Sequence, residues 1–191
     1  MSDTGYSTCL WFDSEAEAAA RYYCDVLPGA VLGDISRYTE AGPGEPGKVL
    51  TVGFRLGTQE FMLLNGGPHF TLTEAASISV SCSGQAEVDR LWAALTADGG
   101  EESMCGWLKD RWGVSWQIVP RELVALLSDP DPGRASRAMT AMLGMRKIDI
   151  AAVQAAADAA KAPSPQGRAG RQGSAPRRGK PGPDRGVVLT Q

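Results

Sequence analysis

The order of predicted secondary structure occurs twice along this 191-residue chain, and this repeat restricts its fold more than any other feature. In each half, a strand leads into an amphipathic helix, and further strands follow the helix. The first unit covers residues 6–64 and the second covers residues 76–119. Two such units predict an α+β domain with pseudo-twofold symmetry, whose paired sheets curve around a cleft.

The clearest patterns lie in the first unit. Apolar residues alternate with Thr51, Gly53 and Arg55 over residues 50–56, which is typical of a half-buried strand. Apolar positions recur every three or four residues over 15–27, and a Pro-Gly pair ends this helix. In the second unit, the pattern predicts a strand over 76–83, a helix over 85–98, and strands over 102–109 and 114–119.

The chain beyond the second unit divides into a helical part and a basic tail. Helical periodicity over 121–160 is interrupted near 128–132 and at Gly144, which predicts three helices. We therefore expect one globular domain over residues 1–160, with a helical extension from about residue 121. Residues 161–191 contain seven basic and one acidic side chain and eleven Gly or Pro, which predicts a disordered basic tail.

The tail allows two interpretations. Its arginines and lysines are able to contact nucleic acid phosphates without sequence preference. A solvated extension is the simpler interpretation, because no aromatic residue lies between the charges.

Several classes of protein are excluded by the composition. No stretch has the roughly 18 consecutive apolar residues of a membrane helix, and residues 1–8 lack the features of a signal peptide, so we expect a cytoplasmic protein. The single histidine, His69, excludes a multi-histidine metal site. The four cysteines have no spacing that suggests a zinc site.

Several separated motifs carry a resemblance to a known family. They are LWFD at 10–13, ARYY at 20–23, LNGGP at 64–68, CGWLKD at 105–110, GVSWQIVP at 113–120, LSDPDP at 127–132 and MRKIDI at 145–150. In these motifs the chain resembles the PhnB-like family of the glyoxalase/bleomycin-resistance/extradiol-dioxygenase (vicinal oxygen chelate) superfamily, which often carries the label 3-demethylubiquinone-9 3-methyltransferase. The resemblance covers about residues 6–155. It implies two βαβββ modules that form an open, cup-shaped sheet, usually assembled as a homodimer.

The resemblance also implies positions for a binding site. Glyoxalase-type enzymes of the superfamily hold a divalent metal between four inward side chains, one on the first and last strand of each module. The corresponding positions here are Thr8, Asn65, Ser77 and Gln117. The two-residue period of a strand places Phe12, Phe61 and Ser79 on the same faces. These seven residues are the predicted ligand-binding residues, although the Asn-Gly pair at 65–66 is equally typical of a turn.

The chemistry of these positions argues against the enzymes of the superfamily. None of the four is a carboxylate, imidazole or thiolate, and neutral oxygen donors are poor ligands for zinc, nickel or iron. We therefore expect no catalytic metal and no cofactor. The Gly-rich segment 42–47 contains prolines and precedes a strand, so it does not support a methyltransferase loop either. His69, in the connection between the units, is the remaining candidate for a general acid or base.

The leading hypothesis is a PhnB-like, homodimeric protein that binds a small organic molecule in its cup without a catalytic metal and has no membrane partner. The reaction, if any, is unknown. The alternative is a metal-dependent glyoxalase- or dioxygenase-like enzyme that uses His69 or a carboxylate such as Glu60, Glu74 or Glu101. A third hypothesis is a dimeric scaffold or regulator whose basic tail contacts nucleic acid.

Overall fold

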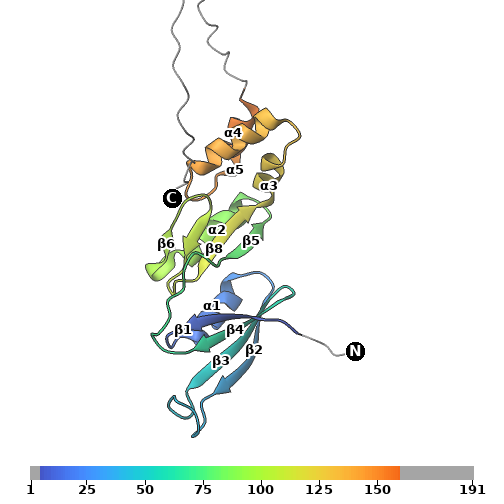
Figure 1. Cartoon of the computed structure of the whole chain (residues 1–191). Helices are drawn as coiled ribbons and strands as arrows, with labels where there is room; N and C mark the ends of the chain where they lie inside the picture. Colours follow the sequence, from blue (N-terminus) through green and yellow to red (C-terminus); the bar gives the residue numbers. More distant parts are fainter. Residues whose placement is uncertain (1–4, 160–191) are drawn as a thin grey trace, which may run out of the picture. The chain divides into compact units, whose positions relative to one another are not determined.

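The computed structural model describes residues 5–159, and residues 8–120 contain two modules with the same order of elements (Figure 1). The first module consists of β1 (Thr8–Phe12), α1 (Ala16–Val26), β2 (Ala30–Arg37), β3 (Val49–Leu56) and β4 (Gln59–Asn65). The second consists of β5 (Ile78–Cys82), α2 (Gln85–Leu95), the 3-10 helix η1 (Ala97–Gly99), β6 (Glu101–Glu102), β7 (Trp107–Lys109) and β8 (Ser115–Pro120).

The two sheets have the same strand order. The first is β1-β4-β3-β2 and the second is β5-β8-β7-β6. In each, the first and last strands of the module pair in parallel, and the other neighbours are antiparallel. This shared topology confirms the predicted α+β fold with two βαβββ modules.

The second module departs from its predicted elements where tertiary hydrogen bonds replace strand pairing. The single strand expected over 102–109 is wrong, because β6 ends at Glu102 and β7 begins at Trp107. Between them, Cys105 has a left-handed backbone with φ of 60°. The N–H groups of Cys105 and Gly106 donate, each at 2.7 Å, to the carbonyl oxygens of Met145 and Arg146. The chain therefore leaves the sheet to bind the segment before the last helix.

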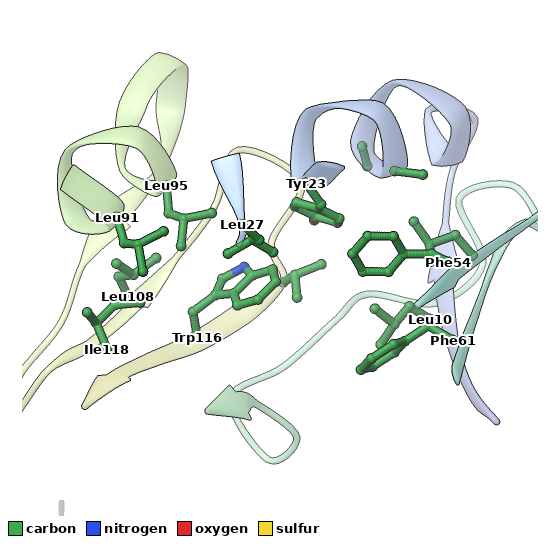
Figure 2. Packing of buried hydrophobic residues seen from close by; sticks show 14 of the residues in the cluster. Leu10, Tyr23, Leu27, Phe54, Phe61, Leu91, Leu95, Leu108, Trp116 and Ile118 are labelled. Carbon is green, nitrogen blue, oxygen red and sulfur yellow. The ribbon is translucent and has the colours of Figure 1, made fainter. Parts of the chain in front are cut away.

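Both helices bury small or apolar side chains in one core that extends through the two modules. Ala16, Ala19 and Ala20 of α1 are fully buried, which lets the helix approach its sheet closely. Figure 2 shows Tyr23 and Trp116 in this core, between leucines of the second module and phenylalanines of the first. The ring of Tyr23 lies 5.2 Å from that of Trp116 and 5.6 Å from that of Phe54. Aromatic contacts therefore join the modules.

A buried carboxylate lies at the same junction. Asp110 follows β7 and is 3% exposed, and its carboxylate accepts four hydrogen bonds. The Tyr23 hydroxyl (2.6 Å) and the Trp116 indole N–H (2.8 Å) donate to Oδ2, and the backbone N–H groups of Trp112 (2.9 Å) and Val114 (3.0 Å) donate to Oδ1. Burial raises the pKa of the Asp110 carboxyl, and these hydrogen bonds oppose the shift. One side chain thus shapes the β7–β8 turn and holds α1 of the other module.

The C-terminal part of the described chain forms the three predicted helices, α3 (Arg121–Leu127), α4 (Pro132–Leu143) and α5 (Ile150–Asp158). Side chains of Asp131 and Asp149 cap the starts of α4 and α5 by accepting backbone N–H groups. The three helices share a small core of their own that includes Leu126, Ile148 and Val153. None of the helices described is long and apolar enough to cross a membrane. The predicted tail over 161–191 lies outside the described residues.

We predict that Asp110→Asn lowers the free energy of unfolding by about 2–4 kcal/mol, because buried donors lose their acceptor. The side-chain amide of the introduced asparagine has two orientations. In one, its nitrogen faces the Trp116 N–H, and in the other it faces the two backbone N–H groups. None of these N–H groups is able to accept a hydrogen bond from that nitrogen. Urea unfolding at neutral pH measures the change. The control is Asp98→Asn, which removes an exposed ion pair with Arg111 and costs less than about 1 kcal/mol. Equal effects of the two substitutions would contradict the role assigned to Asp110.

Candidate functional site

Four of the seven predicted binding residues line one cavity of about 590 Å³. Thr8 and Phe61 come from the first and last strands of the first module, and Ser77 and Ser79 come from the start of the second. The remaining walls come from β1, β4, the 71–76 linker and the start of β8. Polar residues of the lining are Thr8, Gln59, Thr71, Thr73, Ser77, Ser79 and Ser115, and large apolar ones are Leu10, Phe61, Leu72, Ile78 and Val114.

Gln117 is not among the residues that line this cavity, but its side chain contacts Ser77, which does line it. Its side-chain Nε2 donates a hydrogen bond of 2.8 Å to Ser77 Oγ, so the amide occupies an acceptor position of the hydroxyl. The Ser77 O–H then remains available as a donor, because a hydroxyl carries one proton as well as its lone pairs. On the other wall, Gln59 Nε2 lies 3.5 Å from Thr8 Oγ1, which is a long contact. The structure therefore brings Ser77 and Gln117, two of the four implied positions, into contact and leaves a hydroxyl donor at the cavity.

Ser115 was not among the predicted site residues, although it lines the same cavity. Its residue is 2% exposed, and its Oγ has no hydrogen-bond partner within residues 5–159. Ile78 pairs with Trp116, so Ser77 and Ser115 are neighbours just before this pair on adjacent strands. The available signal was the two-residue period that places Ser115 on the face of Gln117. The 71–76 linker carries no such period, so no pattern indicated that it forms a wall.

Asn65 has a structural position instead. Its Oδ1 accepts a 2.8 Å hydrogen bond from the backbone N–H of Ala16, and its Nδ2 donates at 3.1 Å to the carbonyl oxygen of Val49. Glu15, the residue before α1, makes no side-chain capping bond. The amide of Asn65 therefore caps α1 from the end of β4 and ties the helix to β3.

The glycines after Asn65 explain the rest of the LNGGP motif. The indole N–H of Trp11 donates to the Gly67 carbonyl at 2.8 Å. A Cβ on Gly66 would lie 2.2 Å from the Trp11 ring, and Gly67 has a φ of 82°. This turn requires glycine because of a close aromatic contact and a left-handed backbone.

The structure places Phe12 and His69 away from the 590 Å³ cavity. Phe12 is buried in the core and borders a separate hollow of about 340 Å³. His69 is exposed and lines a third cavity of about 960 Å³, which also contains Asn65 and the carboxylates of Asp13 and Glu15. The candidate acid or base therefore does not meet the hydroxyl-lined cavity.

The residues present do not fit a divalent transition metal. In the part of the chain that the structure describes, no three His, Cys, Asp or Glu side chains come together as metal ligands. Of the four implied ligand positions, Asn65 is engaged with the backbone, and Ser77 and Gln117 bond to each other. All four are neutral donors, which suit such metals poorly.

The carboxylates of the alternative hypothesis lie in exposed ion pairs. Glu60 lies 3.6 Å from Arg55, and Glu74 and Glu101 each lie 3.2 Å from Lys109. None of these carboxylates is among the residues that line the 590 Å³ cavity.

We predict that Asn65→Ala lowers the free energy of unfolding by about 2 kcal/mol, because the Ala16 N–H and the Val49 carbonyl lose their partners. Urea unfolding followed by circular dichroism measures this cost. Ser79→Ala, at an exposed position of the cavity wall, serves as the control and stays within about 0.5 kcal/mol of the wild type. An Asn65→Ala protein as stable as the wild type would return Asn65 to the candidate ligand-binding residues.

Comparisons with known proteins agree with this fold. The family model described as 3-demethylubiquinone-9 3-methyltransferase matches residues 4–119 and ends just before α3. A search of the curated proteins gave no match. Among solved structures, the PhnB protein of Bacillus cereus is similar, with 35% identity and a TM-score of 0.55 over 61% of this chain and 99% of that chain.

Two further structures extend the comparison. Protein PA1353 of Pseudomonas aeruginosa has 22% identity and a TM-score of 0.50 over 62% of this chain and 98% of its own, which shows the fold alone. A glyoxalase/bleomycin resistance protein of Albidiferax ferrireducens has 16% identity and a TM-score of 0.41, with coverage of 61% and 98%. From the family match over more than half of its length, the chain belongs to the 3-demethylubiquinone-9 3-methyltransferase (PhnB-like) family.

Proposed function

We propose that this protein binds a small, uncharged organic molecule in the 590 Å³ cavity, without a catalytic metal. The observation that carries the proposal is the lining, in which the described residues include hydroxyls, one amide and apolar side chains but no charged group. A charged ligand buried there would lose its hydration without gaining an ionic partner, which is costly. An uncharged molecule with an apolar body and a few polar atoms matches both kinds of wall.

The same lining favours binding over proton-transfer catalysis. General acid–base chemistry needs a titratable side chain within hydrogen-bond reach of the reacting atom. Among the residues described around this cavity, none titrates near neutral pH. Within residues 5–159, no cluster of metal-ligating side chains favours the metal-dependent alternative. The hypothesis that the basic tail contacts nucleic acid concerns residues 161–191, which lie outside the described residues.

We also propose that two copies associate through the face of the first sheet that lies opposite α1. Val31 is 44% exposed and Met62 is 37% exposed. Val31 pairs with Arg55 of β3, and Met62 pairs with Gly53 of β3. Positions 53 and 55 are two residues apart, so the side chains of Val31 and Met62 lie on the same face of the sheet. Covering exposed apolar side chains with a second copy supplies hydrophobic free energy. A cytoplasmic location remains a sequence-based prediction.

The binding proposal predicts a preference for uncharged probes. In a 19F NMR titration, 4-fluoroacetophenone binds the wild-type protein at least tenfold more tightly than 4-fluorobenzoate, because the cavity offers no cation to the carboxylate. Ser79→Trp places a large ring at the cavity wall and weakens ketone binding at least tenfold. Ser81→Trp is the matched control, since Ser81 is exposed on the same face of β5 but outside the lining, and it keeps the affinity within twofold.

Three results would contradict the proposal: equal binding of ketone and carboxylate, unchanged binding by the Ser79→Trp protein, and no binding of the ketone at all. Native mass spectrometry of the purified protein adds an independent readout, because a retained organic mass lost in the Ser79→Trp protein identifies the natural ligand.

For the association of two copies, we predict that Met62→Glu converts a dimer into a monomer in light scattering coupled to size-exclusion chromatography. A buried, unpaired carboxylate at the interface opposes association. Met104→Glu, at a 45% exposed methionine of the second module, is the control and leaves the mass unchanged. A monomeric wild-type protein, or a dimer that survives Met62→Glu, would overturn this interface.

A further inference from the structure

Asn65 is the only asparagine of the chain, and a glycine follows it. In an Asn-Gly pair the backbone nitrogen of glycine reaches the asparagine side chain readily, because glycine has no Cβ to hinder the approach. The lone pair of that nitrogen bonds to Cγ, the Cγ–Nδ2 bond breaks, and Nδ2 leaves as ammonia with the proton of the backbone nitrogen. Water then opens the resulting succinimide at either carbonyl carbon, which leaves aspartate or isoaspartate.

The fold engages every group that this deamidation needs. Oδ1 of Asn65 accepts from the Ala16 N–H at 2.8 Å, and Nδ2 donates to the Val49 carbonyl oxygen at 3.1 Å. The attacking group, the N–H of Gly66, donates to the Phe12 carbonyl oxygen at 2.9 Å. Asn65 is also buried, so little water reaches it. The reaction therefore requires that the amide and the Gly66 N–H leave these partners.

The partners of Asn65 lie together at one end of the first sheet. Phe12 ends β1, Ala16 begins α1, Val49 begins β3 and Asn65 ends β4. Tyr38, just after β2, donates its hydroxyl to the backbone carbonyl oxygen of Asn65 at 2.8 Å. Because these contacts are neighbours, a local opening breaks them while the rest of the module stays folded. The 960 Å³ cavity, which Asn65 and Tyr38 line, borders the same end.

We propose that Asn65 is a covalent modification site, at which deamidation is controlled by local opening of this end of the sheet and releases α1 from β3. Aspartate has no N–H to donate to the Val49 carbonyl and places a carboxylate oxygen against it. Isoaspartate adds a methylene to the backbone just before Gly66, where the Trp11 ring leaves no room even for a Cβ. The inference is independent of any ligand in the 590 Å³ cavity.

Mass spectrometry of the full chain, incubated at mildly alkaline pH, measures the conversion, and peptide mapping assigns it to the single asparagine. In guanidinium chloride the conversion is at least about thirtyfold faster than in the folded protein, the factor to which the net free energy of two hydrogen bonds corresponds. Equal rates in the two states would overturn control by the fold, and no conversion in either state would overturn the modification site.

Two matched variants separate local from global opening. Tyr38→Phe removes the hydrogen bond to the Asn65 carbonyl and raises the rate in the folded protein about three- to tenfold, as expected for one hydrogen bond. Tyr22→Phe removes a similar bond, 2.6 Å long, to the carbonyl of Ala94, and keeps the rate within about twofold because Asn65 is not involved. Both variants convert at the wild-type rate in guanidinium chloride. An equal increase in the two folded variants would overturn local control.

The consequence for α1 is tested with Asn65→Asp, which is one product of the reaction. Its urea midpoint lies below that of the wild type, because the Val49 carbonyl loses its donor. Gln59→Glu makes the same amide-to-acid change at the exposed start of β4 and leaves the midpoint nearly unchanged. A wild-type midpoint for Asn65→Asp, or an equal decrease in both variants, would overturn the release of α1.

Discussion

The hydrogen bonds to the buried Asp110 carboxylate hold the two modules in their relation to each other. Tyr23 reaches this carboxylate from α1, while Trp116 and two backbone N–H groups reach it from the second module. Removing a carboxylate from water costs free energy, and several hydrogen-bond donors are needed to compensate for the lost hydration. Because four donors converge here, α1, the β7–β8 turn and β8 have one mutual arrangement. The aromatic contacts of Tyr23 then fill the space around the polar centre.

The hydroxyl-lined cavity follows from that arrangement. Its walls come from both modules and from the linker that joins them, so its shape depends on how the modules pack. The one charged side chain of the 71–76 linker, Glu74, is exposed and pairs with Lys109. What remains inside is an uncharged lining of hydroxyl, amide and apolar side chains. The chemistry of this lining therefore differs from that of the charged cavity beside His69.

Local patterns predicted most of the fold because the physical rules that they reflect act over short distances. Alternation of apolar residues located β3, and the interruption expected near 128–132 lies between the end of α3 and the start of α4, where Asp131 caps the helix. The strand expected over 102–109 was wrong because Cys105 and Gly106 bond to residues about 40 positions away. No local pattern reports such a bond, so the interruption between β6 and β7 was visible only in the structure.

By itself, the sequence determined the two βαβββ modules, the three helices after them and the neutral, polar side chains at the four implied site positions. Only the tertiary structure decided which hydrogen bonds and contacts the individual side chains make. Asn65 and Gln117 are both amides on the last strand of their modules, Asn65 at the end of β4 and Gln117 within β8. Asn65 nevertheless caps α1, whereas Gln117 orients Ser77. The reason is that a strand's period sets the face on which a residue lies, whereas its hydrogen-bond partner is set by which distant segment packs against that face.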